Sequence, residues 1–366
     1  MAPLSGIEVL DFSTLLPGPL ATLLLAEAGA TVTKVERPGD GDEMRGYEPR
    51  LGETSVNFAL LNRGKQSLEL DLKAAAGRKA LERRLADADV LVEQCRPGVM
   101  DRLGIGYDAV SSINPRIVYC SISGYGSSGP RAGRAGHDLN YVGDAGLLDL
   151  AAGGDGEPVV PAVLVADIGG GAYPAVMNIM LALYERQRTG RGRHIEIAMA
   201  ENVLTWMYWA IGNGLGAGLW PRRGGELLTG GSPRYQLYRT ADGRSVAAAP
   251  LEDRFWENFC ELIGLDRDLR DDRRDPETTR AAVAKLIAAR TAADWEVSFS
   301  RADVCCTIVR TAREAAEDPA FAARRLFASW TGDGAGATMP ALVVPIDPGM
   351  RRAETNLAAP GLGGNN

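Results

Sequence analysis

The first 36 residues contain an apolar strand, an apolar helix and a second apolar strand, and this order limits the fold more than any other feature. Residues 7–12 (IEVLDF) have the pattern of a buried strand, residues 18–29 (GPLATLLLAEAG) that of a helix ending at Gly29, and residues 31–36 (TVTKVE) that of a second strand. Two strands joined by one short helix lie parallel in a sheet. The segment is therefore a predicted βαβ unit.

Further patterns extend this unit into a predicted doubly wound parallel sheet of the α/β class. Strand patterns recur at 89–93 (DVLVE) and 116–121 (RIVYCS), and a helix pattern lies at 74–87. The turn after the first strand reads TLLPGPL, without the G-x-G-x-x-G motif that places a dinucleotide against a helix. A nicotinamide cofactor is therefore not expected.

The length of 366 residues exceeds the usual size of a single core, which indicates a large domain with a smaller one. The smaller domain is predicted to be α+β, because two strand patterns flank an Asp242-Gly243 turn and three helix patterns follow at 252–264, 278–290 and 292–301. We expect a large domain at 1–211, a Gly- and Arg-rich linker at 212–232, the small domain at 233–303, a return to the large domain at 304–358, and a disordered tail at 359–366.

Composition argues against several functions. The net charge is −7 and the 40 basic residues are spread along the chain, which argues against nucleic-acid binding. The start, MAPLSGIEVLDF, does not have the pattern of a signal peptide, and no apolar run reaches membrane-spanning length, so we expect a cytoplasmic protein without membrane insertion. The five cysteines are scattered without metal-ligand spacing, which indicates reduced thiols and no metal site.

Five segments carry a specific family resemblance, in order along the chain from about residue 4 to residue 330. They are GIEVLDFSTLLPGPLATLLLAEAGATVTKVERPGDGD, LNRGKQSLELDL, VEQCRPGVMDRLGIGYD, NPRIVYCSISGYGSSGP and TGRGRHIEIAMAE. Together they resemble the family III CoA-transferases (CaiB/BaiF), a superfamily that includes the α-methylacyl-CoA racemases. The resemblance implies an acyl-CoA substrate, no separate cofactor, and a homodimer of interlocked subunits. It also implies an active site between the large domain of one subunit and the small domain of its partner.

Three short matches make the racemase branch the most similar part of the superfamily. They are AGHDLNY around His137, VLVADIGGG around Asp167 and APLEDRFW around Glu252. By this resemblance His137 and Asp167 are two acid/base groups, and Glu252 supports the histidine. Asp138, beside His137, is the alternative supporting residue.

Two positions separate the chain from transferase-like relatives, and one separates it from the racemases. Relatives of the formyl-CoA-transferase type keep the aspartate of Asp167 but usually carry an aromatic residue in place of His137. They also tend to have a glutamine at the position of Leu16. Racemases of this kind often have an asparagine where this chain has Val163, which removes a hydrogen-bond partner for Asp167.

Racemisation next to a thioester needs two acid/base groups on opposite faces of the α-carbon. One removes the proton to give an enolate, and the other returns a proton from the opposite side. A neutral His137 and an ionised Asp167 would serve opposite enantiomers. We expect Asp167 to cap a helix, and we expect the enolate oxygen to meet backbone N–H groups of this helix start, at Asp167, Ile168 and Gly169.

The CoA portion needs cations for its phosphates and room beside its thioester. Candidate CoA-binding residues lie in the matching segments at predicted strand ends and turns, where open α/β sheets bind ligands. They are Arg37, Arg63, Lys65, Arg96, Gly124, Tyr125 and Gly126. His194 lies in a strand pattern and is expected to be structural.

The sequence therefore predicts a 2-methylacyl-CoA racemase of lipid or fatty-acid metabolism, with two alternatives. The first is a family III CoA-transferase, in which Asp167 attacks the acyl-CoA thioester and forms a mixed anhydride. The second is an acyl-CoA-binding relative without catalysis, which the Val163 difference suggests. The acyl group stays open between a sterol side chain, a branched fatty acid and a small acid, because acyl pockets use generic apolar side chains.

Overall fold

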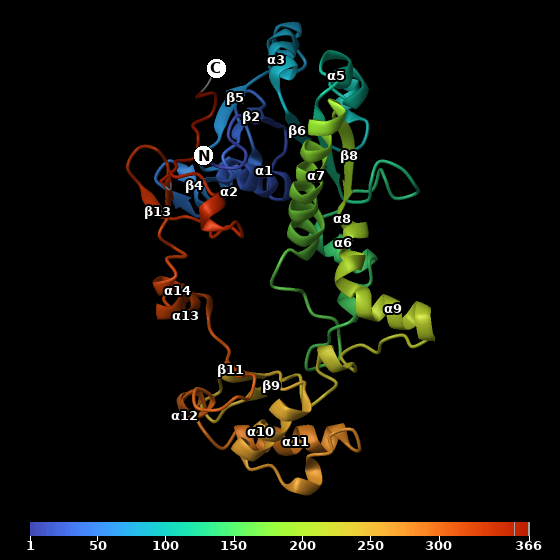
Figure 1. Cartoon of the computed structure of the whole chain (residues 1–366), viewed down its shortest axis with the longest axis vertical. Helices are drawn as coiled ribbons and strands as arrows, with labels where there is room; N and C mark the ends of the chain where they lie inside the picture. The colour runs from blue at the N-terminus through green and yellow to red at the C-terminus, as the bar shows by residue number, and fades with distance from the viewer. Residues whose placement is uncertain (355, 365–366) are drawn as a thin grey trace. The chain divides into compact units, whose positions relative to one another are not determined.

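The computed structural model describes residues 1–354 and 356–364 and divides the chain into two compact units (Figure 1). Unit 1 consists of Met1–Ala145, Ala162–Trp206 and Pro319–Asn366, and unit 2 of Gly146–Pro161 and Met207–Asp318. The expected boundaries at 211 and 304 are therefore displaced. The return to unit 1 comes later because β11 (Cys306–Ile308) pairs with β10 (Ser245–Ala248) and belongs to the small sheet.

Unit 1 contains a six-stranded sheet, and the parallel arrangement predicted from the first βαβ unit is confirmed. The strand order is β5-β2-β1-β6-β7-β8, and every neighbouring pair is parallel. The order reverses between β1 and β6, which places a binding crevice at the carboxyl ends of the central strands. The strands are β1 (Glu8–Asp11), β2 (Thr31–Glu36), β5 (Gln66–Glu69), β6 (Val90–Glu93), β7 (Val118–Ser123) and β8 (Arg193–Ala198).

Both faces of this sheet are covered. Val9 and Leu10 are neighbours on β1 and point to opposite faces, yet both are buried. Leu10 belongs to a core that includes Leu81 of α3 and Val110 of α5. The helices of unit 1 are α1 (Pro17–Glu27), α2 (Val56–Asn62), α3 (Ala75–Asp87), α4 (Val99–Arg102), α5 (Tyr107–Ile113), α6 (Asp138–Asp144), α7 (Tyr173–Thr189), α8 (Met199–Val203) and α14 (Pro319–Ala323).

Short two-stranded sheets complete unit 1. They are formed by β3 (Arg50–Leu51) with β4 (Thr54–Ser55), and by β12 (Trp330–Gly332) with β13 (Thr338–Pro340). No helix among residues 1–354 and 356–364 is long and apolar enough to cross a membrane.

Unit 2 is α+β, as predicted for the small domain. Its antiparallel sheet has the order β11-β10-β9, and the β9 (Gln236–Arg239) to β10 hairpin turns through the predicted Asp242-Gly243, where Gly243 has a φ of +77°. The core includes Trp256, Phe259 and Trp295. The helices of unit 2 are α9 (Tyr208–Ala217), α10 (Asp253–Ile263), α11 (Pro276–Ile287), α12 (Ala292–Phe299) and α13 (Ala312–Ala316).

Two expected irregular segments are more ordered than their composition indicated. The predicted linker 212–232 includes the second half of α9 and a 3₁₀ turn at Leu227–Thr229. In the predicted disordered tail, the Gly363 N–H donates to Ser67 Oγ at 3.0 Å, and the Pro360 carbonyl accepts from Arg45 at 3.0 Å. The disorder prediction is therefore wrong for 359–364, because backbone groups there pair with Ser67 and Arg45. Residues 365–366 lie outside the described residues.

Candidate active site

Asp167 lies inside a π-helix, Val165–Ala172, that continues directly into α7. The residue before this π-helix is Leu164, so the expectation that Asp167 caps a helix is wrong. The Asp167 N–H donates instead to Asp138 Oδ1 at 3.0 Å, and the Ala166 N–H donates to the same oxygen at 2.7 Å. The π-helix leaves the Asp167 side chain partly buried. Such helices occur frequently at functional sites.

The glycines after Asp167 let the π-helix pack closely against α8. A Cβ at Gly170 would lie 2.5 Å from the Met199 carbonyl oxygen, and a Cβ at Gly169 would lie 2.6 Å from the Trp206 ring. Asn202 Nδ2 donates to the Gly170 carbonyl at 2.8 Å, which ties the two segments together. The glycine run therefore positions the backbone that carries Asp167.

Most of the backbone N–H groups expected to bind the enolate oxygen already donate hydrogen bonds within the protein. The Asp167 N–H is paired with Asp138, and the Ile168 N–H donates to the Leu164 carbonyl at 3.1 Å. Gly169 lies within the same π-helix. The prediction that the N–H groups of Asp167 and Ile168 bind an enolate oxygen is therefore corrected, because these groups already have acceptors.

His137 stands at the start of α6, directly before Asp138. Its backbone N–H donates to Asn140 Oδ1 at 3.0 Å, and its side chain is exposed. Close to it, the Tyr141 hydroxyl donates to the Gly136 carbonyl. His137 is therefore linked to Asp167 through the next residue, Asp138, and it is close enough to lower the pKa of Asp167.

The surroundings of Asp167 make its carboxyl group a weaker acid than usual. Burial is the largest cause, and the negative charge of Asp138 adds to it, so that the pKa rises to about 6, while His137 acts in the opposite direction. Burial and the nearby Asp167 in turn raise the pKa of Tyr141 to about 12. A carboxyl group with a pKa near neutrality can both accept and donate a proton.

Glu252, the third predicted catalytic residue, belongs to unit 2. It is the exposed residue that precedes α10, and its side chain does not cap that helix. Its role beside His137 stays a prediction.

Arg63 and Lys65 are core residues, and the prediction that they bind phosphates is wrong. Arg63 is 1% exposed and forms an ion pair with Glu27 at 2.7 Å. The Lys65 Nζ lies 3.1 Å from Asp11 Oδ2 and donates to Thr22 Oγ1 at 2.8 Å. Burial of both cations is offset by these partners, which leaves neither of them facing solvent.

Arg37 and Arg96 are exposed and line separate cavities of unit 1. The Arg37 cavity has about 270 Å³ and lies where β1 and β2 end, with an apolar wall that includes Leu72 and Leu103. Lys73 is a second exposed cation there, while Lys34 is buried against Asp42. The lining also includes the carboxylates of Glu36, Glu43 and Asp71. Its combination of apolar wall and rim cations suits a nucleotide with phosphates.

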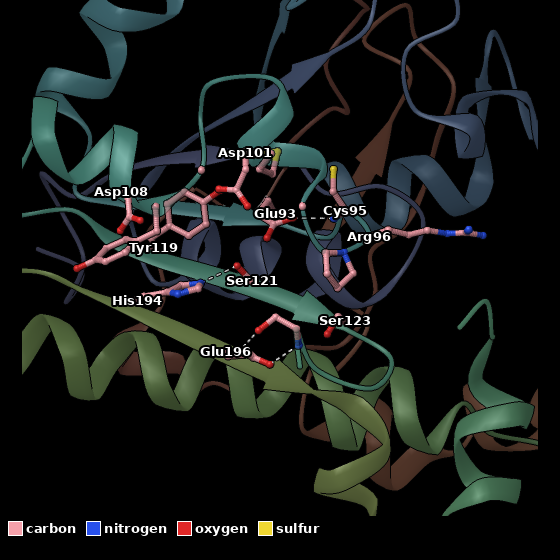
Figure 2. A pocket seen from close by; sticks show the side chains of 16 residues that line it. Glu93, Cys95, Arg96, Asp101, Asp108, Tyr119, Ser121, Ser123, His194 and Glu196 are labelled. Carbon is pink, nitrogen blue, oxygen red and sulfur yellow. Dashed lines mark hydrogen bonds between the residues drawn. The ribbon is translucent and has the colours of Figure 1, made fainter. Parts of the chain in front are cut away.

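The Arg96 cavity has about 260 Å³ and lies beside the end of β6 and along β7 and β8, from Tyr119 to Ser123 and from His194 to Glu196 (Figure 2). There, His194 Nε2 is 2.9 Å from Ser121 Oγ, and its ring stacks on Tyr107 with 5.1 Å between centroids. These contacts agree with the structural role expected for His194. In Figure 2 the Arg96 side chain extends away from His194.

The Gly124-Tyr125-Gly126 loop pairs its polar groups within unit 1. The Tyr125 hydroxyl donates to Asp144 Oδ2 at 2.7 Å, and the Gly126 N–H donates to Ser123 Oγ at 3.0 Å. The Gly124 carbonyl accepts from the Ala200 N–H at 2.9 Å. The loop supports α6 and α8, and its contact with CoA stays a prediction.

Asp138 has contacts that the sequence did not indicate. It was considered as a support for His137, but its carboxylate turns toward residues 166 and 167. The position of Asp138 directly after His137 was the sequence feature that drew attention to it. Among residues 1–354 and 356–364, no group of three or more His, Cys, Asp or Glu side chains is arranged to hold a metal ion.

Unit 1 is thus an α/β fold with a parallel sheet, and it carries a carboxyl group, that of Asp167, whose raised pKa suits proton transfer or nucleophilic attack. Residues 4–366 match the model of CoA-transferase family III, and the chain belongs to this family.

The relatives include both racemases and transferases. An α-methylacyl-CoA racemase of Mus musculus is 37% identical over 318 residues, which cover 85% of this chain and 79% of the relative. An acetyl-CoA:oxalate CoA-transferase of Acetobacter aceti is 33% identical over 353 residues, covering 94% and 89%. The crystal structure of a CAIB/BAIF family protein from Brucella suis superposes with a TM-score of 0.84 at 30% identity, covering 99% of this chain and 97% of that one. The relatives therefore establish the family but do not separate the two reactions.

Proposed function

We propose that this protein is a 2-methylacyl-CoA racemase that uses His137 and Asp167 as its two acid/base groups. The observation that carries the proposal is the placement of Asp167, whose carboxyl group has a pKa of about 6 and whose backbone is held by the residue next to His137. A carboxyl group of this kind exchanges protons readily near neutral pH. The mouse racemase relative agrees with this reading.

The proposed reaction transfers one proton in each half. One base removes the α-proton, and the electron pair of the C–H bond moves into the thioester to form an enolate. The other group, in its protonated form, then gives a proton to the opposite face of the same carbon. The roles of His137 and Asp167 exchange with the direction of the reaction. After one turnover the first base holds the proton and the second group has lost one, so proton exchange with solvent must restore the starting state before the same enantiomer reacts again.

The cavity lined by Arg37 is the proposed site of the CoA nucleotide. Arg37 and Lys73 supply cations for phosphate groups, and Leu72 and Leu103 supply an apolar surface for the base. CoA is part of the substrate in this proposal, and no further cofactor takes part.

A homodimer is part of the proposal. Met177, Leu181 and Tyr184 follow helical spacing along α7, and all are exposed. Exposed apolar side chains along one helix face indicate a surface that another chain covers. We propose a second copy of this chain as the occupant, with Glu252 of its small domain reaching His137. Sedimentation at micromolar concentration tests the assembly, and a stable monomer of 38.9 kDa would contradict it.

CoA transfer is the second candidate, because a transferase relative covers 94% of the chain. In that reaction the Asp167 carboxylate attacks the thioester carbonyl, the C–S bond breaks, and CoA leaves as thiolate while an acyl-aspartyl anhydride remains. A carboxylate acceptor is needed to complete the cycle. The racemase needs only one substrate.

Incubation of a chiral 2-methylacyl-CoA in deuterated water, without any added carboxylate, tests the proposal. We expect deuterium at the α-carbon together with loss of stereochemical purity. Turnover that occurs only when a carboxylate acceptor is added would establish the transferase instead. Binding without exchange or transfer would identify an acyl-CoA-binding protein that lacks catalysis.

A further inference from the structure

We infer that Asp138 is a positioning residue, whose carboxylate holds the Asp167 backbone beside His137 and places a negative charge next to the Asp167 carboxyl group. The catalytic consequence rests on the proposed function. The placement itself does not, because it follows from contacts within unit 1.

The geometry gives one carboxylate oxygen two backbone partners. Asp138 Oδ1 accepts from the Ala166 N–H at 2.7 Å and from the Asp167 N–H at 3.0 Å, and the Asp138 residue is only 6% exposed. Hydrogen bonds to a charged acceptor are stronger than neutral ones. Asp138 therefore joins the first turn of α6 to the start of the π-helix, and His137 is attached to the same turn.

The titratable groups that influence the pKa of Asp167 lie on or next to α6. On α6 the facing groups are Asp138, which raises the pKa of Asp167, His137, which lowers it, and Tyr141, whose own pKa responds to Asp167. The side chains and backbone that meet the glycine run from other elements belong to Pro17 of α1, Met199 of α8 and Trp206 of the 3₁₀ turn Leu204–Met207, and none of the three side chains titrates. Asp138 is thus the negative charge with the largest influence on Asp167.

Two variants distinguish a residue that only anchors the backbone from one that also raises the pKa of Asp167. Asp138→Asn keeps an oxygen that can accept both N–H groups but removes the charge. Asp138→Ala removes the acceptor as well. If Asp138 only anchors the backbone, the asparagine variant should titrate like the parent at Asp167.

The test is a pH titration of the full-length protein labelled with ¹³C at aspartate carboxyl carbons, with Asp167→Asn used to assign the Asp167 signal. We expect a midpoint near pH 6 in the parent. In Asp138→Asn the midpoint should fall by about half a pH unit or more, because a neighbouring like charge is lost. Asp144→Asn removes a charge from the same helix without touching residues 165–167 and should leave the midpoint in place.

The anchoring part is tested by α-proton exchange. Asp138→Ala should lower kcat by about 10-fold to 100-fold with a smaller change in KM, because a misplaced base loses reactivity more than the substrate loses affinity. Asp138→Asn should keep most of kcat, and the acid limb of its pH–rate profile should move to lower pH.

An unchanged Asp167 midpoint in Asp138→Asn would overturn the electrostatic part, and parent kcat in Asp138→Ala would overturn the anchoring part. If Asp138→Ala does not fold, the asparagine variant still decides the first question. The titration requires no turnover. A protein that shows the expected midpoint shift but no exchange would therefore refute the proposed reaction and leave the role of Asp138 intact.

Discussion

The Asp138 carboxylate accepts the Asp167 N–H at 3.0 Å, so the residue next to one proposed base holds the backbone of the other. This contact connects α6 with a π-helix that is distant in sequence. It also places two carboxyl groups close enough for one to weaken the acidity of the other. In the proposed mechanism, this contact connects the exposed turn that carries His137 with the helix that carries Asp167.

The pH dependence of racemisation should follow Asp167. The pKa of its carboxyl group is raised to about 6, so the carboxylate needed as a base is lost as the pH falls through about 6. The values of kcat/KM for the two enantiomers are linked by the equilibrium constant, and both should decline together. Initial rates in both directions across this range test the prediction. An acid limb near 4, the ordinary range of an aspartate, would contradict it.

The close contact of the glycine run makes Gly170 sensitive to substitution. In Gly170→Ala the new methyl group would lie 2.5 Å from the Met199 carbonyl oxygen, which is backbone and cannot turn away. We expect a loss of about 1 to 3 kcal/mol in unfolding free energy and a large loss of activity. Gly212→Ala is the matched control, because it lies in α9 with no atom within 4 Å of the added Cβ. Equal behaviour of the two variants in urea unfolding would refute the packing argument.

Arg37 and Arg96 are expected to bind the CoA portion. Replacement of either by alanine should weaken the binding of a CoA ester by about 10-fold to 150-fold, the equivalent of losing one charged hydrogen bond. Both side chains are exposed, so the unfolding free energy should change little. Calorimetric titration with a non-reactive CoA ester measures the effect. Parent affinity in both variants would place the phosphates elsewhere.

Lys65 should show the opposite behaviour. Lys65→Met removes a buried cation that pairs with Asp11 and leaves this carboxylate with one partner fewer. We expect a loss of about 3 kcal/mol or more in unfolding free energy, because an incompletely paired buried charge is costly. The folded fraction should bind CoA esters as the parent does. A variant of parent stability with weakened binding would return Lys65 to the CoA site.

The helices and strands with a strong apolar periodicity could be predicted from the sequence. The edge strand β5 and the C-terminal segment could not. The first βαβ unit and the hairpin at Asp242-Gly243 were predicted because each carries its apolar pattern or turn residues locally. Strand β5 was missed because QSLE is largely polar and has two buried positions. The tail 359–364 was expected to be disordered from its composition alone. The Gly363 N–H nevertheless donates a hydrogen bond to Ser67 Oγ, and no local sequence pattern indicates this contact.

The errors at the site have a common physical origin, which is that the partners of charged side chains are distant in sequence. Arg63 and Lys65 look like surface cations, but their partners Glu27 and Asp11 lie 36 and 54 residues away. Asp138 was considered only as an alternative support for His137. The direction of its carboxylate depends on where the chain returns at residues 166–167, which only the tertiary structure determines.

The most direct test of the proposed mechanism is deuterium exchange measured separately for each enantiomer of a 2-methylacyl-CoA, in His137→Ala and in Asp167→Ala. If the two groups act on opposite faces, each variant should exchange the α-proton of one enantiomer only, without inversion, and the two variants should differ in which enantiomer exchanges. Inversion should fall by about 10² to 10⁴ in both variants, the usual contribution of an acid/base group. Inversion of both enantiomers by His137→Ala at the parent rate would contradict the account.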